Sequence, residues 1–546
     1  MLYRSYISLI VSPVRLLFTP LQLLLFSSLC LSGCADDDFF QEDARATAAE
    51  LVGRKPAGPD SAWVVAGRHY DRSGFHTFFW GDHNRAIWAM PVKVPVFRLD
   101  SLYGGLTVVK KGGGFQTTSF TLEDKQGRSY ALRSLDKDPV EVVPPFWRRT
   151  FVANVLRDQT SASNPYGALV VPVLAEAAGV YHASPRLYYV ASSDTSFGEH
   201  AATVQGKMFL LQEKFEGPAD LTPAFGAAVS FADTEKVLRL RYRKNTYHIN
   251  QQAFARARLL DLLVGDWDRH KGQWEWAVTK EGQETIFNPI PKDRDQVFMK
   301  MSDGLIPAIA TSKFVVRKFH SFDKDFDDVQ AYMINAKFVD ERFLNELSLP
   351  EWQQIAKSLQ KSLTDEVIKK AVRELPLPIY NQFGQGLVEK LKNRRDQLAA
   401  AAEKMYRLLA KEVTVAGADT KEKFTVNRLS DEQTEITVAR AATSRLPARQ
   451  LYHRIFNSNE TKSITLHGLA GDDTFLVKGN ADHGILINIY GGLGEDIIAD
   501  SSEVSDWKKR TRIYDTARGN VLYFGSEARD MTTRDVRVHA YDREGN

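Results

Sequence analysis

The stretch DLLVGDWDRHKGQWEW, residues 261–276, ends an apolar helical run at Gly265 and continues with a dense set of acidic, basic and amide side chains. A second acidic segment, PIPKDRDQVF (residues 289–298), follows a strand-like pair with the sequences WEWAVTK and ETIFNPI. Capped helices and surface ion pairs would explain either segment alone. Their close spacing, on either side of one expected β-hairpin, favours two loops that serve a single site.

The residue types in these two segments suit phosphoryl transfer. That chemistry needs one carboxylate to accept a proton from the attacking hydroxyl group, and further oxygen ligands to hold Mg²⁺ against nucleotide phosphates. Asp268 precedes Gln273 by five positions, which is the spacing of the base and the metal-binding amide in H-R-D-x-x-x-x-N loops. Asp293 or Asp295 would supply the second metal carboxylate. We therefore predict Asp268 as the base, with Gln273 and one or both of these aspartates at the metal.

The two segments together resemble the G-x-x-D-R-H and later D-x-G-x-x-F elements of atypical kinases of the secretory pathway. Spore-coat CotH-like kinases show similar features. The resemblance implies a two-lobed protein-kinase-like fold in which Asp268 is the catalytic base and Gln273 is a metal-site or loop-ordering group. It also implies that Arg269 and His270 fix the catalytic loop or touch phosphate.

The second segment follows the secretory pattern less closely than the first. Asp293 lies five residues before Phe298, as the metal-binding Asp does in that pattern. Asp295 stands where the pattern has its glycine. The choice between Asp293 and Asp295 as metal ligand therefore stays open.

A glycine-rich turn and a basic strand precede these loops. Gly112, Gly113 and Gly114 lie between strand-like segments, where a kinase-like fold has its phosphate-covering loop, although a plain hairpin turn would explain them equally well. The next strand-like segment, SYALRSLDKD, carries Arg133 and Lys137, either of which could contact phosphates. These five residues form the predicted nucleotide-binding set.

The C-terminal part contains two related turns, GLAGDDTFLVKG (468–479) and GGLGEDIIAD (491–500), which begin 23 residues apart. The second fits the G-G-x-G-x-D-x-U unit of RTX-like β-rolls, and in the first Leu469 replaces the second glycine. The resemblance implies calcium between stacked turns, with Asp473 and Asp496 as carboxylate ligands. Two glycine turns in a β-sheet or a short solenoid explain the pattern as well.

Residues 1–33 have the pattern of a lipoprotein signal peptide, because Arg4 and Arg15 precede a broken apolar stretch that ends in small residues. LSGC (31–34) matches a bacterial lipobox, which predicts palmitate or another acyl chain on Cys34 and attachment to a membrane. We expect an outer-membrane lipoprotein of a Gram-negative envelope, either periplasmic or surface-exposed. The alternative is a poor membrane anchor in which Cys34 remains an ordinary thiol.

The chain as a whole resembles a family of outer-membrane-associated proteins from Bacteroidetes-type bacteria. The shared elements are GDWDRH, P-x-DRDQ-x-F and G-x-x-GDD-x-F. Some members carry a phosphoesterase domain or a BamA-like barrel, and neither pattern occurs in this sequence. The resemblance therefore makes a separate outer-membrane barrel a candidate partner.

Composition is that of a folded protein with more than one domain, since 546 residues exceed one ordinary core and 43% are hydrophobic. A formal net charge of +3 gives no support to nucleic-acid binding. The predicted fold class is α+β, a two-lobed kinase-like fold followed by an all-β sheet or short solenoid. The predicted parts are a signal peptide (1–33), a polar tether (34–74), a β-rich N-lobe-like region with one helix (75–217), a helical C-lobe-like region (218–412) and a C-terminal β domain (413–546).

Together these patterns predict an envelope lipoprotein that transfers a phosphoryl or nucleotidyl group to an envelope substrate in a Mg²⁺-dependent reaction. The alternative is a non-catalytic scaffold or binding protein, whose β domain binds calcium or glycan. A more distant alternative is a hydrolase that uses the same carboxylates to bind a metal. No ATP supply is evident outside the cytoplasm, so the nucleotide stays open.

Overall fold

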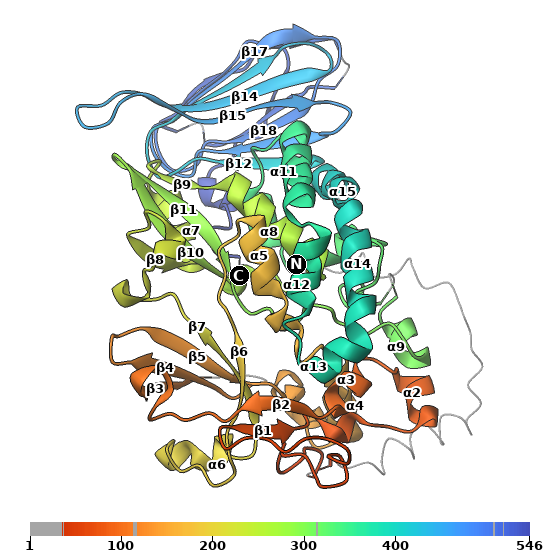
Figure 1. Ribbon diagram of the computed structural model, residues 1–546. Coiled ribbons are helices and arrows are strands. Elements are labelled where there is room, and N and C mark those ends of the chain that lie inside the picture. Colours follow the sequence, from red (N-terminus) through yellow and green to blue (C-terminus); the bar gives the residue numbers. More distant parts are fainter. Residues whose placement is uncertain are drawn as a thin grey trace.

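The computed structural model shows mixed helices and sheets followed by an all-β region, which confirms the predicted α+β class at this level (Figure 1). Cys34, Gly113 and Gly114 lie outside the described residues, so their predicted roles stay predictions. None of the helices described here is both long and apolar enough to cross a membrane. The structure describes residues 35–36, 38–112, 117–312, 315–505, 508–516 and 518–545.

The predicted polar tether is wrong for residues 38–74, which belong to the folded body. Phe39 and Tyr70 are buried in the main hydrophobic core. Strand β1 (Ser61–Val64) pairs with the antiparallel β2 (Val92–Pro95). The segment has a polar composition because its few core side chains are separated by many charged ones. These core residues follow no helical or strand periodicity, so the sequence does not indicate their burial.

A five-stranded antiparallel sheet follows, with strand order β3-β4-β5-β7-β6. One of its faces is apolar, since Phe120 and Leu122 of β4 are fully buried in a cluster with Leu132 and Phe209. The strands are β3 (Leu106–Gly112), β4 (Ser119–Asp124), β5 (Ser129–Ser134), β6 (Arg186–Tyr189) and β7 (Met208–Glu213).

The prediction of a single helix in residues 75–217 is wrong, because several helices lie there. Two of them are only five and four residues long, too short to leave a helical periodicity in the sequence. The helices are α2 (Gly74–Trp80), α3 (Arg85–Ala89), α4 (Phe151–Gln159), α5 (Val171–Ala178) and α6 (Ala201–Val204).

The opening stretch of sequence joins helix α8 to a second sheet. Asn250 caps α8 by accepting a hydrogen bond from Ala253 N, and Gly265 ends the helix in the left-handed conformation with φ of 72°. The hairpin β10–β11 that follows is the centre of a sheet with order β8-β10-β11-β9. These elements are α7 (Thr234–Arg243), α8 (Gln251–Val264), β8 (Ser230–Asp233), β9 (Tyr247–Ile249), β10 (Trp274–Glu281) and β11 (Glu284–Pro291).

Helices cover α8 and separate the two ends of the molecule (Figure 1). Trp274 and Trp276 pack on Phe254 of α8, so these tryptophans belong to the core. Helices α5, α11, α14 and α15 pack against α8. The helices between residues 305 and 410 are α9 (Leu305–Ala310), α10 (Lys337–Phe343), α11 (Leu349–Ser362), α12 (Asp365–Val372), α13 (Leu377–Ile379), α14 (Gln385–Asp396) and α15 (Leu398–Ala410).

The C-terminal region is a short solenoid with its own apolar core. Parallel strands stack in two sheets, β12-β16-β18-β21-β23 and β13-β17-β19-β22, and the antiparallel hairpin β14–β15 extends the second sheet. Ile464 pairs with Ile487, and Phe475 with Ile498, so the 23-residue repeat is one turn of the solenoid. The strands are β12 (Glu412–Ala416), β13 (Lys423–Arg428), β14 (Gln433–Arg440), β15 (Arg449–Asn457), β16 (Ser463–His467), β17 (Thr474–Ala481), β18 (Leu486–Tyr490), β19 (Ile497–Asp500), β20 (Glu503–Val504), β21 (Thr511–Tyr514), β22 (Val521–Tyr523) and β23 (Ala528–Asp530).

Candidate functional site

A cavity of about 510 Å³ lies between the five-stranded sheet and the loops that flank the hairpin β10–β11. The sheet contributes side chains of β4, β5 and β7 to its lining, and the two loops contribute the opposite wall. Six residues singled out from the sequence line this one cavity, although they come from segments far apart in the chain. They are Arg133, Lys137, Asp268, Gln273, Asp293 and Asp295.

Two ion pairs cross the cavity. Arg133 of β5 pairs with Asp293, and Lys137, just after β5, pairs with Asp295. Burial acts to raise the pKa of Asp295, but the Lys137 ammonium and the Arg133 guanidinium outweigh it and hold this pKa below its ordinary value. Both aspartates line the cavity and each pairs with a cation, so their positions do not decide which of the two would bind the metal.

Asp268 is half-buried at the start of the loop after α8. One carboxylate oxygen, Oδ1, accepts a hydrogen bond of 2.7 Å from Asn335 Nδ2. Asn335 lies just before α10, 67 residues further along the chain, and no sequence motif marked it. Its amide fixes the orientation of the Asp268 carboxylate beside the cavity.

Gln273 connects the two loops through its backbone and offers an unused side-chain oxygen. Its carbonyl oxygen accepts a hydrogen bond of 3.1 Å from Lys292 N, which ties the Asp268 loop to the Asp293 loop. Within the part of the chain that the structure describes, no hydrogen bond reaches its buried Oε1 atom. A buried amide oxygen without a donor is costly unless a cation or water supplies a partner, so this atom suits a metal ligand.

Arg269 is fully buried, and its guanidinium group contacts the backbone of the loop that contains Asp293. Its guanidinium donates to the backbone carbonyl oxygens of Lys292 and Asp293, both at 2.8 Å, and pairs with Asp266 at 3.1 Å. Of the two roles that the kinase resemblance implied, these contacts match loop fixing. A phosphate in the cavity would not meet this side chain, since Arg269 does not line it.

Two other predicted residues also lie outside the cavity lining. His270 is exposed, and its Nδ1 accepts a hydrogen bond of 3.0 Å from Gly272 N. Gly112 ends β3 and pairs with Ser119 of β4. Thr117 and Ser119 do line the cavity, so the hairpin that contains the glycine-rich turn borders it.

A buried network of charges, which the sequence did not reveal, supports both loops. Asp261 of α8 pairs with Arg258 at 2.9 Å and with Arg294 of the second loop, and Arg294 also pairs with Asp266 at 3.0 Å. Arg258 further pairs with Asp340 of α10 at 2.8 Å. Opposite charges at such depth hold each other in place, and the network thereby connects α8, both loops and α10.

The predicted calcium residues belong to a ladder of polar side chains inside the solenoid. Each member stands directly before a strand of the second sheet and accepts a hydrogen bond from the backbone N–H of the member one turn earlier. Asp473 Oδ1 accepts from Glu422 N at 2.7 Å, Asp496 Oδ1 from Asp473 N at 2.8 Å, and Asn520 Oδ1 from Asp496 N at 2.7 Å. In Asp473 and Asp496, one carboxylate oxygen is therefore already engaged in a hydrogen bond with the backbone.

The other carboxylate oxygens of the ladder are buried against glycine corners. Among the described residues, no hydrogen bond reaches the buried Oδ2 atoms of Asp473 and Asp496, which lie beside Gly468 and Gly491, and the same holds for Oδ2 of Asp515, which follows β21 outside the ladder. Burial raises the pKa of Asp473 to about 9, with help from the charges of Glu422 and Asp496, and raises that of Asp496 to about 7. No group of three or more His, Cys, Asp or Glu in the described ranges is arranged to hold a metal ion, and calcium here stays a prediction.

We expect Asp473→Asn to stabilise the protein at alkaline pH. Below the unfolded pKa of 3.8 both states of wild-type Asp473 are protonated, and the full stability is present. As pH rises toward about 9, the unfolded carboxyl loses its proton while the folded one keeps it, so stability falls by up to about 1.4 kcal/mol per pH unit. Asn removes that loss and keeps the Oδ1 acceptor, as Asn520 does two positions further in the ladder.

Urea unfolding of both proteins at pH 5 and pH 8.5 measures this difference. The advantage of Asp473→Asn should be small at pH 5 and clearly larger at pH 8.5. Asp482→Asn, which changes an exposed aspartate of the same region, should follow the wild type at both pH values. An advantage that does not change with pH would contradict a buried protonated Asp473.

Comparisons with known proteins give little beyond the geometry. No family model matches the chain, and no curated protein matches it. Among solved structures, the chain has a weak likeness to the proinflammatory kinase CtkA of Helicobacter pylori, at 10% sequence identity over 52% of this chain and 93% of that chain. The TM-score of 0.26 is too low for this likeness to carry an argument about fold or function.

Proposed function

We propose that the cavity beneath the five-stranded sheet binds a nucleotide together with Mg²⁺, and that the protein is a kinase-like phosphotransferase acting on an envelope substrate. The observation that carries this proposal is the meeting of Arg133 and Lys137 with Asp293 and Asp295 in a single cavity. Cations on one wall and carboxylates on the other are what a phosphate–metal complex needs. Localisation at the outer membrane through acylated Cys34 is part of the same proposal.

The ion pairs would open when ligand binds. Arg133 and Lys137 would turn to the phosphate oxygens, which accept charge-assisted hydrogen bonds from guanidinium and ammonium groups and carry more negative charge than one carboxylate. Asp293 and Asp295 would then be free for Mg²⁺, with Gln273 Oε1 as a further oxygen ligand. Mg²⁺ in that position would neutralise charge on the transferred group.

Asp268 is the proposed general base because it combines reach and orientation. Its carboxylate lines the cavity and is held by Asn335 through one oxygen. The acceptor hydroxyl group would donate its proton to the carboxylate as its oxygen attacks phosphorus, and the nucleoside diphosphate would leave with the electron pair of the broken P–O bond. Arg269, through the carbonyl oxygens of Lys292 and Asp293, would keep base and metal loops in register.

Ligand-induced stabilisation tests the proposal. We expect Mg²⁺ and a nucleoside triphosphate together to raise the Tm of the wild-type protein, by an amount equivalent to about 2.7 kcal/mol at one hundred times Kd. Either component alone should have a smaller effect, because each needs the other to neutralise the cavity. The measurement is thermal unfolding with ATP, GTP, CTP and UTP at millimolar concentration.

Two variants make the test specific. Asp293→Asn should lose most of the Mg²⁺-dependent rise, since it removes one of the two metal carboxylates. Glu123→Gln, an exposed acid of the same sheet outside the cavity lining, should keep it. No stabilisation of the wild type by any nucleotide would contradict the phosphotransferase and favour the scaffold alternative.

A further inference from the structure

Helices α2 and α9 present an exposed apolar surface. In the sequence, α2 precedes all the residues that line the cavity and α9 follows them. The two helices pack side by side (Figure 1). Phe75 is 78% exposed, Phe78 65% and Ile309 63%, and Leu305 and Ile306 are exposed beside them. We call these five residues the apolar face. Single exposed apolar residues are ordinary, whereas a group of five large ones marks a contact surface.

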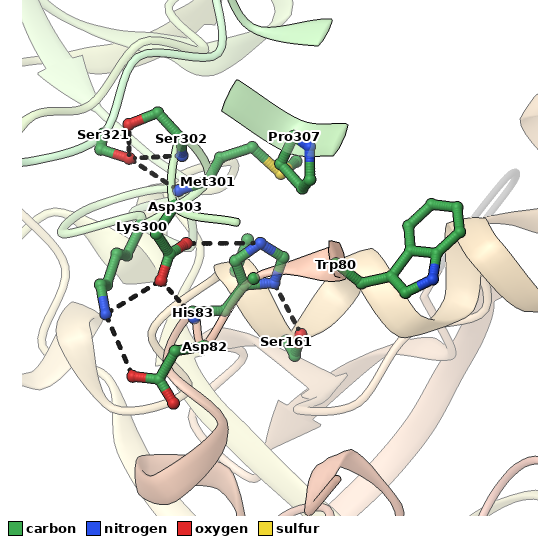
Figure 2. A network of polar contacts seen from close by, with 12 residues as sticks. Trp80, Asp82, His83, Ser161, Lys300, Met301, Ser302, Asp303, Pro307 and Ser321 are labelled. Carbon is green, nitrogen blue, oxygen red and sulfur yellow. Dashed lines mark hydrogen bonds and ion pairs between the residues drawn. The ribbon is translucent and has the colours of Figure 1, made fainter. Parts of the chain in front are cut away.

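A polar network fixes the ends of both helices, so the apolar face is held rigidly (Figure 2). His83, three residues after α2, donates its backbone N–H to Asp303 Oδ2 at 2.7 Å, and its ring Nδ1 lies 3.0 Å from Ser161 Oγ. Lys300 Nζ joins Asp303 Oδ2 at 3.0 Å and Asp82 Oδ2 at 3.3 Å. These contacts fasten the loop before α9 to the turn after α2.

The backbones at this junction approach each other so closely that only glycine fits. A Cβ atom at Gly304 would clash with the backbone of Gly81. Pro307 is the buried residue of α9, while its other side chains point outward. Because these contacts fix the position of α9, its apolar side chains stay exposed to solvent in the folded protein.

The first described residues contact helix α4, which also contacts α2. Ala35 N donates to Arg149 O at 3.1 Å, and Asp36 O accepts from Arg157 of α4 at 2.8 Å. The next residue of α4, Asp158, lies 3.1 Å from the ring of His76 in α2. Residue 36 and helix α2 are therefore attached to neighbouring positions of one helix turn.

More exposed apolar side chains lie at the other end of α4. Phe146 is 78% exposed and Trp147 is exposed next to it. They precede Arg149, whose carbonyl oxygen holds Ala35. Exposed apolar side chains thus lie near α4 at both of its ends, on α2 next to Asp158 and at Phe146 and Trp147 before Phe151.

We propose that the apolar face, together with Phe146 and Trp147, docks on the surface of a lipid bilayer. The proposal rests in part on the lipoprotein assignment of Cys34. The residues directly before Ala35 are the apolar stretch that ends in Cys34, and either acylation of Cys34 or retention of that stretch brings hydrocarbon to the point where Ala35 is held. A protein surface as occupant has no comparable support.

Docking would orient the molecule as well as attach it. The apolar side chains would add to the membrane affinity that lipid on Cys34 supplies, because binding strength grows with the apolar area buried in the bilayer. Aromatic side chains such as Phe75, Phe78 and Trp147 suit the boundary between lipid headgroups and acyl chains. The bilayer would then lie along α2, α9 and α4, and the cavity and the solenoid would keep a fixed orientation to it.

Vesicle binding without the acyl chain tests this proposal. Among the described residues, the first one in an apolar core is Phe39, so a chain that starts at Ala35 retains every core residue that the structure describes. We expect this chain to sediment with vesicles of phosphatidylethanolamine and phosphatidylglycerol. The double variant Phe78→Ser with Ile309→Ser should lower the partition coefficient by about tenfold or more, because two exposed side chains lose their burial in lipid.

The matched control changes two exposed apolar residues of the C-terminal region, Leu429→Ser with Val538→Ser, and should bind as the wild type does. A second readout does not depend on the folding of the double variant. Phe78→Trp should give additional fluorescence that brominated acyl chains quench, and Val538→Trp should not. No vesicle binding by the wild type, or equal loss in the control, would overturn the proposal. Self-association that the Phe78 and Ile309 substitutions abolish, without vesicle binding, would overturn it in favour of a protein partner.

Discussion

Asp268→Asn is expected to lower turnover by about 10²- to 10⁴-fold while leaving the binding of Mg²⁺ and nucleotide unchanged. Asn keeps the shape of the side chain and an oxygen that can accept from Asn335, but it cannot take a proton from an attacking hydroxyl group. Transfer of labelled phosphate from the nucleotide to water or to the protein itself measures turnover when the acceptor is unidentified. Ligand-induced stabilisation measures binding in the same samples.

The control for this variant is a residue of the hairpin β10–β11, at the end away from Asp268. Glu281→Gln changes an exposed acid next to the β10–β11 turn and should retain full turnover. Turnover that survives in Asp268→Asn would remove Asp268 from the role of base. Binding without any turnover in the wild type would instead leave a nucleotide-binding protein, which is the non-catalytic alternative with a ligand.

Asp261→Asn is expected to lower the free energy of unfolding by about 3–5 kcal/mol. The Asp261 carboxylate is fully buried and neutralises two guanidinium groups, those of Arg258 and Arg294. Asn has nearly the same volume, so the loss reflects uncompensated buried charge and not a cavity. Urea or thermal unfolding of the purified variant measures it.

An exposed ion pair provides the comparison. Asp365 pairs with Lys392 at 2.5 Å and with Arg395 at 2.7 Å, and its contacts resemble those of Asp261 except that they lie at the surface. Asp365→Asn should cause a much smaller loss, because water and salt already screen the pair. Equal losses in the two variants would show that burial does not set the strength of the network.

Local sequence patterns were enough to predict the two loops that line the cavity. Helix α8 ends at Gly265 because glycine readily adopts the left-handed conformation that terminates a helix. The hairpin β10–β11 is predicted by apolar residues that alternate on either side of Gly282. Those two signals place the loops of Asp268 and Asp293 at one end of a hairpin. Short-range spacing was therefore enough to predict that Asp268 and Asp293 line the same cavity.

The partners that hold those side chains could not be predicted in this way. Asn335 approaches Asp268 from a different segment, and Asp340 reaches Arg258 across 82 residues. The prediction of a polar tether fails over residues 38–74 for the same reason, since this segment contributes only a few isolated side chains to the core. No periodicity or motif encodes contacts of this kind.

The sequence by itself determined the end of α8, the hairpin β10–β11, the 23-residue spacing of the two glycine turns and the set of candidate polar residues, because each depends on neighbours within a turn or a strand. Only the tertiary structure decided that Arg269 is buried beneath the loops while Asp268 faces the cavity, although they are adjacent. The same holds for the apolar face, whose residues look like core positions in the sequence. Burial is a property of what packs against a side chain, and the packing partners come from segments far away along the chain.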